Sequence, residues 1–96
     1  MRDDVREAGP WLTLEELSRA VAVSPDWLAE RVQAGLIEVH GQGPSGWRFD
    51  AWVVRRVRSM QHTERCYGAV PELAALVADL EEQILRLRGQ LARLPA

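Results

Sequence analysis

Two acidic residues four positions apart are the first candidates for a binding role. Asp26 and Glu30 fall on one face of any helix that contains them, because residues i and i+4 are neighbours on a helix surface. Such carboxylates could pair with basic side chains of a partner, or they could belong to an ordinary solvated face. Trp27, between them, is either an aromatic anchor for an interface or, like Leu28, part of the core.

A cluster of arginines is the second candidate. Arg55, Arg56 and Arg58 lie close together in the sequence, with Arg65 nearby. Guanidinium groups bind phosphates and carboxylates, so the cluster could contact nucleic acid or an acidic partner, or it could be an exposed helix face that balances acidic residues elsewhere. The full set of candidate partner-binding residues is Asp26, Trp27, Glu30, Arg31, Arg48, Arg55, Arg56 and Arg58.

The sequence contains no recognisable catalytic or metal-binding pattern. Cys66 is the single cysteine, which excludes an intrachain disulfide, and His40 and His62 are far from each other in sequence, whereas zinc sites usually need four ligands. There is no glycine-rich phosphate loop, activated serine or distinctive pair of carboxylates. We therefore expect no enzymatic activity, no metal and no cofactor.

The charge balance is unfavourable for a nucleic-acid-binding protein. The 96 residues carry a net charge of -2, and all 12 basic residues are arginine. Residues 11–50 contain six acidic and three basic side chains, a net charge of -3, whereas phosphate contacts normally come from cations or helix N-termini. An acidic surface repels DNA and attracts a basic protein.

No apolar run is long enough for a membrane span, and the charged N-terminus lacks a signal sequence, so we expect a cytoplasmic protein.

Local signals place short helices and a hairpin before a long arm. We expect a flexible tail over 1–10 and a helix-turn-helix with a wing over 11–65. A capping box at Thr13 and Glu16 starts the first helix near Leu14. The remaining expectations are a second helix over 25–34 ended by Gly35, strands at 36–40 and 47–49, a third helix capped by Asp50 with Val53, Val54, Val57 and Met60 facing inward, and a joint over 66–69. Trp47, Phe49 and Trp52 should pack the wing onto the body, and Trp11 could hold the start of the first helix.

The last part of the chain, residues 66–96, has the repeat of a coiled coil. Apolar residues recur at alternating spacings of three and four from Val70 to Leu94, which is typical of a narrow seam that needs a partner helix. Acids precede bases along this arm, which favours an antiparallel homodimer with Glu81 near Arg88 of the other copy. β-branched a and leucine d positions instead favour a parallel pair, and a helix folded back on its own domain is a third possibility. The candidate dimerisation residues are Leu73, Val77, Leu80, Ile84, Leu87 and Leu91.

Several short motifs, in this order, resemble the MerR superfamily of winged helix-turn-helix proteins. The motifs are Leu14-Glu15-Glu16-Leu17, Val23-Ser24, Gly35-Leu36-Ile37 and Gly46-Trp47-Arg48-Phe49. The resemblance covers the chain from Trp11 onward and implies a mainly α fold: a MerR-like winged helix-turn-helix with a long C-terminal helix that forms an antiparallel coiled-coil dimer. DNA-binding members typically carry Arg-Tyr-Tyr-Glu before the Gly-Leu-Ile triplet, where this chain has Ala29, Glu30, Arg31 and Val32.

Within that superfamily the chain is most similar to the CbpM type of chaperone modulator. The matching segments are Trp47-x-Phe49-Asp50, Val53-Val54-Arg55-Arg56-x-Arg58 leading to His62, Asp79-Leu80, and Arg86-Leu87-Arg88-x-Gln90-Leu91. The resemblance implies a dimer that binds the J-domain of a DnaJ-like co-chaperone, CbpA, and inhibits it. J-domains carry a basic second helix at which DnaK docks, so the modulator would act by competition. The alternatives are a MerR-type transcription factor that binds a DNA palindrome and a dimeric adaptor for another partner.

Overall fold

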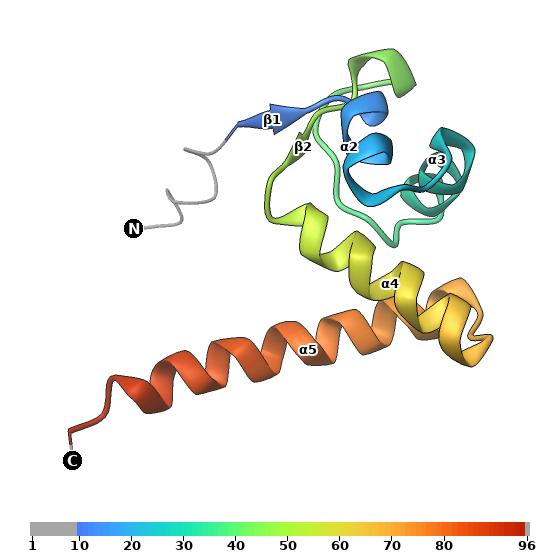
Figure 1. Cartoon of the computed structure of the whole chain (residues 1–96). Helices are drawn as coiled ribbons and strands as arrows, with labels where there is room; N and C mark the ends of the chain where they lie inside the picture. The colour runs from blue at the N-terminus through green and yellow to red at the C-terminus, as the bar shows by residue number, and fades with distance from the viewer. Residues whose placement is uncertain (1–9, 96) are drawn as a thin grey trace.

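The computed structural model describes residues 10–95 and is mainly helical. The described chain runs β1 (Trp11–Leu12), α2 (Leu14–Val21), α3 (Pro25–Gln33), the 3-10 turn η1 (Pro44–Gly46), β2 (Phe49–Asp50), α4 (Val53–Tyr67) and α5 (Pro71–Ala92). The short elements gather around the start of α4, while α5 turns back along α4 and extends well beyond it (Figure 1). The predictions of a mainly α fold and a long C-terminal helix are confirmed.

The first helix forms where its capping signals predict. The Thr13 hydroxyl accepts a hydrogen bond from the backbone N–H of Glu16 at 3.1 Å, and the Glu16 carboxylate accepts one from the N–H of Thr13 at 2.9 Å. This reciprocal pair satisfies two N–H groups that the helix itself leaves without acceptors. Leu17 and Val21 are buried one turn apart, so α2 presents its predicted apolar face to the core.

The second helix also follows its sequence signals. Ser24 caps it by accepting from the N–H of Trp27 at 3.0 Å, and Pro25 occupies the first helical position. Ala34 is the C-cap, and Gly35 follows with a φ of 80°. The helix therefore ends one residue earlier than predicted. Leu28 is fully buried, whereas Trp27 is only partly buried.

The predicted hairpin over 36–49 is wrong in detail. No strand forms over 36–40; the two sides meet only at a bridge in which His40 and Arg48 exchange backbone hydrogen bonds of 3.0 and 2.7 Å. The Leu36 N–H instead donates to the Arg31 carbonyl, and the Leu36 carbonyl accepts from Arg56 Nε. These bonds hold the segment in an irregular path that buries Ile37.

The only sheet in the described part of the chain has an unpredicted partner strand. β2 pairs antiparallel with β1, with Trp11 opposite Asp50 and Leu12 opposite Phe49. The sequence analysis predicted this strand over 47–49 and paired it with residues 36–40 instead of with β1. Trp11 also contacts the turn, because its ring lies edge-on to His40 with centroids 4.7 Å apart. The predicted tail over 1–10 lies outside the described residues except for Pro10.

The third helix starts and ends later than predicted. Asp50 does not cap α4; its carboxylate accepts from the N–H of Trp52 at 2.9 Å and so fixes the turn before the helix. Cys66 and Tyr67, expected in the joint, form the last residues of α4, and Gly68 ends it with a φ of 66°. The turn at 50–52 explains the later start, and Gly68 in the left-handed conformation sets the later end.

The core lies between α2, α3, β2 and the inner face of α4. Its largest fully buried side chains are Phe49, Leu17, Leu28, Met60 and Val57. Trp47 is buried edge-on to Phe49 as predicted, whereas Trp52 is 54% exposed and does not pack inside. Val53 is buried, and Val54 is partly buried against the core.

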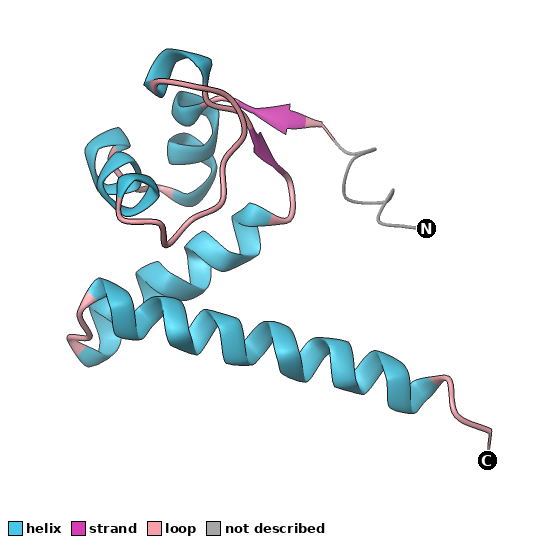
Figure 2. Ribbon diagram, turned by 180° about the vertical axis from the view of Figure 1, so that it is seen from behind, coloured by secondary structure: helices cyan, strands magenta, loops and turns pink. Residues whose placement is uncertain are grey.

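The long helix α5 joins this body through small side chains. Ala74, Ala75 and Ala78 are buried, which lets α5 approach α4 closely. From the reverse side, α4 and α5 form a hairpin whose second arm projects past the rest of the molecule (Figure 2). Across residues 10–95, no helix has the length and apolar character needed to cross a membrane.

Candidate protein-interaction surfaces

An uncovered row of large apolar side chains runs along α5. We call the predicted dimerisation residues Leu73, Val77, Leu80, Ile84, Leu87 and Leu91 the leucine seam. Val77 is partly buried, and the other five are exposed, Leu80 at 54%. The residues that pack α5 onto α4 are the alanines on another side of the helix. The apolar packing of α5 on its own domain thus comes mainly from its alanines, and the row of exposed large apolar side chains on the other side of the helix is typical of an interaction site.

The outer face of α3 is acidic. Asp26 is exposed, and the Glu30 side chain is 76% exposed. Glu30 Oε1 lies 3.5 Å from Nη1 of Arg31, so its carboxylate is partly balanced by that guanidinium. At this exposure the pair contributes little to stability, because water screens it. The two carboxylates thus occupy the accessible side of the helix, as the sequence predicted, and can meet a partner there.

Arg31 points the other way, into an internal cluster. Its Nε and Nη2 donate to both Glu64 carboxylate oxygens at 3.0 and 2.7 Å, and its Nη1 donates to the Trp27 carbonyl at 2.9 Å. The guanidinium carbon lies 3.9 Å from the centroid of the Trp27 ring. Arg31 is therefore held between α3 and α4, and Trp27 forms one wall of this cluster. Sequence reasoning missed Glu64, which is 33 residues away and carries no local signal.

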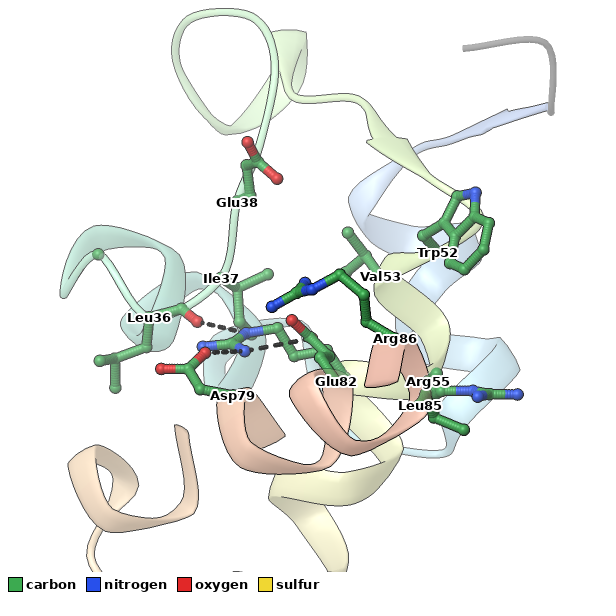
Figure 3. Close-up of a pocket in the computed structure, with 12 residues that line it drawn as sticks. Leu36, Ile37, Glu38, Trp52, Val53, Arg55, Asp79, Glu82, Leu85 and Arg86 are labelled. Atoms are coloured by element: carbon green, nitrogen blue, oxygen red, sulfur yellow. Dashed lines mark hydrogen bonds and ion pairs between the residues drawn. The ribbon is translucent and has the colours of Figure 1, made fainter. Parts of the chain in front are cut away.

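The arginine cluster on α4 is divided between internal and external roles. Arg56 donates from Nε to the Leu36 carbonyl at 2.9 Å and from Nη1 to Asp79 at 2.7 Å and Glu82 at 3.4 Å. The dashed lines in Figure 3 mark these contacts. Arg56 therefore joins α4 to the loop after α3 and to α5.

The other predicted arginines remain accessible. Arg55 is exposed on α4, and Arg58 is exposed while its Nη2 reaches the Ala20 carbonyl at 3.4 Å. Arg48 is exposed in the turn and donates from Nη1 to the carbonyls of Trp47 and Ser45. The structure therefore does not bring the eight predicted residues into one site. Asp26 and Glu30 lie on the acidic face of α3, Arg55 and Arg58 on α4, and Arg48 in the turn, while Arg31 with Trp27 and Arg56 form internal contacts.

A groove that the sequence did not predict lies beside Arg56 and its partners Asp79 and Glu82. It has a volume of about 830 Å³. It lies between the loop over 35–38, the residues around the start of α4 (52–56) and the middle of α5. We call it the α4–α5 groove. In Figure 3, the Arg86 side chain points into it from α5, while Trp52 lies at one end. Its lining comes from three separated segments, so no local sequence pattern could have indicated it.

The cysteine lies next to a histidine on α4. Cys66 Sγ is 3.5 Å from His62 Nδ1, and the His62 ring lies edge-on to Tyr67 with centroids 6.1 Å apart. Between residues 10 and 95, no three His, Cys, Asp or Glu side chains come together in a way that could hold a metal ion. The His62–Cys66 pair follows from their i, i+4 spacing.

Comparison with known proteins identifies relatives over most of the chain. The chaperone modulatory protein CbpM of Pseudomonas entomophila is 31% identical over 83 residues, which cover 82% of this chain and 78% of that protein. The chaperone modulatory protein CbpM of Coxiella burnetii is 30% identical over 83 residues, covering 86% of this chain and 78% of that protein. No family model matches the chain. No solved structure matches it either.

Proposed function

This chain belongs to the family of the chaperone modulatory protein CbpM, and we propose that it is a dimeric modulator that binds the J-domain of a CbpA-type, DnaJ-like co-chaperone and inhibits it. A chaperone-modulating role follows from the relatives. The J-domain as the target, the inhibition of the co-chaperone and the dimer are our proposals.

The acidic face of α3 is the observation that carries the choice of partner. Asp26 and Glu30 face outward, whereas Arg31, the basic residue nearest to them, is turned inward and paired with Glu64. The accessible charge of this helix is therefore negative. Complementary charge favours a basic partner and accelerates its association, and the resemblance to CbpM-type proteins implies the basic second helix of a J-domain. Occupying that helix would inhibit the co-chaperone because DnaK docks on the same surface.

The leucine seam supports a dimer. Its side chains are about half exposed in the single chain, and full burial of an apolar side chain contributes about 1.5 to 3 kcal/mol. Six such residues on each of two chains could offset an association cost of about 4 to 15 kcal/mol. Along α5 the acids Asp79, Glu81 and Glu82 precede Arg86, Arg88 and Arg93, so an antiparallel pair would place unlike charges side by side.

We also assign the body to the MerR-like winged helix-turn-helix class. Helices α2 and α3 are joined by a short turn and pack on each other, α2 also packs on α4, and the Arg31–Glu64 ion pair links α3 to α4. The turn over 41–46 between His40 and Arg48 takes the place of a wing. The antiparallel α5 pair would then present two such bodies related by a two-fold axis.

A MerR-type DNA-binding regulator is the second candidate function. The exposed Arg48, Arg55 and Arg58 favour it, because arginines supply many phosphate contacts. Two of the predicted basic residues are, however, committed to internal bonds: Arg31 with Glu64 and Arg56 with Asp79. The accessible charges of α3 itself, Asp26 and Glu30, are negative, so the J-domain proposal has the stronger support.

A side-by-side titration tests the two functions. The chain is titrated with a purified CbpA-type J-domain and, separately, with a duplex DNA of random sequence at about 0.15 M salt, and tryptophan fluorescence is followed. We expect saturable J-domain binding and no DNA response, and the same J-domain should lose its stimulation of the DnaK ATPase when the chain is added. Salt-sensitive binding to DNA alone would overturn the proposal and favour the regulator.

A further inference from the structure

The α4–α5 groove has two exposed apolar side chains, Trp52 and Leu85, beside a base of buried ones. Ile37 and Val53, which also line it, are buried, and Leu36 is partly buried. Trp52 is 54% exposed and Leu85 is 43% exposed, so an apolar side chain of a partner could pack against both. A volume of about 830 Å³ is within the range that binds several side chains of a ligand.

The groove is separate from the leucine seam. Asp79, Glu82, Leu85 and Arg86 line the groove from α5, and their spacing of three and four places them on the side of the helix that carries Ala75 and Ala78. The seam residues Leu80 and Leu87 fall on another side of α5. A second helix packed along the seam would therefore leave the groove open.

Two of the three arginines that line the groove lack a partner among the described residues. Asp79 and Glu82 both contact Arg56. Arg55 and Arg86, in contrast, form no ion pair or hydrogen bond with any residue from 10 to 95. An unpaired guanidinium beside an apolar wall favours a carboxylate, which it can bind through two parallel hydrogen bonds.

From this juxtaposition we propose that the α4–α5 groove is a second docking surface, which binds an apolar segment of a protein partner with acidic residues on its flanks. The apolar side chains of this segment would contact Trp52, Leu85 and Leu36, and its carboxylates would pair with Arg55 and Arg86. This inference does not depend on the J-domain, whose proposed contact surface is the acidic face of α3.

Two other occupants fit the charges less well. The six charged residues that line the groove are Glu38, Asp79, Glu82, Arg55, Arg56 and Arg86. A polyanion such as DNA, which is negative along its whole length, would meet the three carboxylates as well as the arginines. The distal part of a second α5 carries Arg86, Arg88 and Arg93, which would bring positive charge against Arg55 and Arg86. A short acidic and apolar segment avoids both conflicts.

The test uses three synthetic peptides of about 14 residues, long enough for three to four helical turns. Each has the same leucine face; the flanking positions carry glutamate in the first, glutamine in the second and lysine in the third. Binding to the full chain is followed by NMR at the Trp52 indole N–H and the backbone amides of Leu36 and Ile37. We expect the glutamate peptide to shift these signals and to bind at least about tenfold more tightly than the lysine peptide, as charge-assisted hydrogen bonds would produce.

Charge-reversal variants distinguish specific binding in the groove from nonspecific binding elsewhere on the chain. In Arg55→Glu with Arg86→Glu, the preference should invert so that the lysine peptide binds more tightly. The matched control, Arg65→Glu with Arg93→Glu, reverses two exposed arginines outside the groove and should keep the original preference. Equal affinity for all three peptides, shifts at Leu80 and Leu87 instead of Trp52, or a Trp52 signal that moves when the protein alone is diluted would each overturn the proposal. The last result would place a second copy in the groove.

Discussion

The guanidinium of Arg31 lies 2.7 Å from the carboxylate of Glu64, and this ion pair joins α3 to the C-terminal half of α4. Both side chains are largely covered, with exposed fractions of 10% and 13%. Because water does not screen the pair well, each charge depends on the other for its compensation. The same pair removes Arg31 from the surface on which Asp26 and Glu30 are displayed, so it contributes both to stability and to the negative charge of that face.

We expect Glu64→Ala to lower the free energy of unfolding by about 3 kcal/mol, because it leaves the covered Arg31 charge without its partner. Urea unfolding followed by circular dichroism measures the change. The control is Glu30→Ala, which removes the other carboxylate near Arg31; it is 76% exposed and should change stability by less than about 1 kcal/mol. Equal effects of the two substitutions would mean that the Arg31–Glu64 pair adds nothing beyond a surface contact.

The turn over 41–46 should be sensitive at one glycine. Gly41 has a φ of 98°, and a Cβ at this position would overlap the backbone carbonyl oxygen of Gly46. We expect Gly41→Ala to cost about 3 kcal/mol, because the backbone must move in addition to adopting a conformation that alanine disfavours. Gly68→Ala is the control: its φ is 66° with open space around it, so it should cost only about 1 to 2 kcal/mol. Thermal unfolding measures the stability of both variants. A smaller loss of stability in Gly41→Ala than in Gly68→Ala would contradict the prediction.

The elements with local signals could be predicted from the sequence. The capping box at Thr13 and Glu16, the Ser24 cap and the heptad spacing of α5 each depend on residues within a few positions of one another. Both caps appear in the structure, as does the long helix over the heptad segment. Local hydrogen bonds and apolar periodicity are encoded in neighbouring side chains. The helices were therefore found with errors of one to a few residues at their ends.

The rest depends on contacts between distant residues. Trp11 and Leu12 form too short a strand for any periodicity, and their partner is nearly 40 residues away. Arg56 was expected on an outward face together with Arg55 and Arg58, but Asp79 and the Leu36 carbonyl draw it inward. The α4–α5 groove exists only because three separated segments meet. The β1–β2 pairing, the inward position of Arg56 and the groove all depend on how distant segments meet in the fold, and the local spacing of residues does not reveal this.

The leucine seam leads to a prediction about the oligomeric state. We expect the unmodified chain to be a dimer and Leu80→Asp with Leu87→Asp to be a monomer in light scattering, because a carboxylate in the middle of an apolar interface would lose its hydration. The control, Gln83→Asp with Gln90→Asp, places the same charges at exposed polar positions of α5 and should remain dimeric. A persistent dimer in the seam variant would move the interface to another surface.

The direction of the two arms can be determined by cross-linking. In a Cys66→Ser background, one sample carries Glu81→Cys and another carries Arg88→Cys, and the two are mixed and treated with a short bis-maleimide. In an antiparallel pair, position 81 of one chain lies near position 88 of the other, so the mixture should form the 81–88 product. Each variant alone should cross-link poorly, because identical positions would be about 10 Å apart along the axis. Efficient 81–81 and 88–88 products would instead indicate parallel arms.

The acidic face of α3 leads to the prediction that bears most directly on function. We expect Asp26→Arg with Glu30→Arg to weaken J-domain binding by about a hundredfold, because it replaces two attractive charges by two that repel a basic helix. Light scattering should still report a dimer, since neither residue lies on α5. The control, Glu72→Arg with Gln90→Arg, adds positive charge at exposed positions of α5 and should bind normally. A J-domain affinity unchanged by the α3 substitutions would exclude this helix from the interface, whereas equal losses in both variants would indicate that only the net charge of the chain matters.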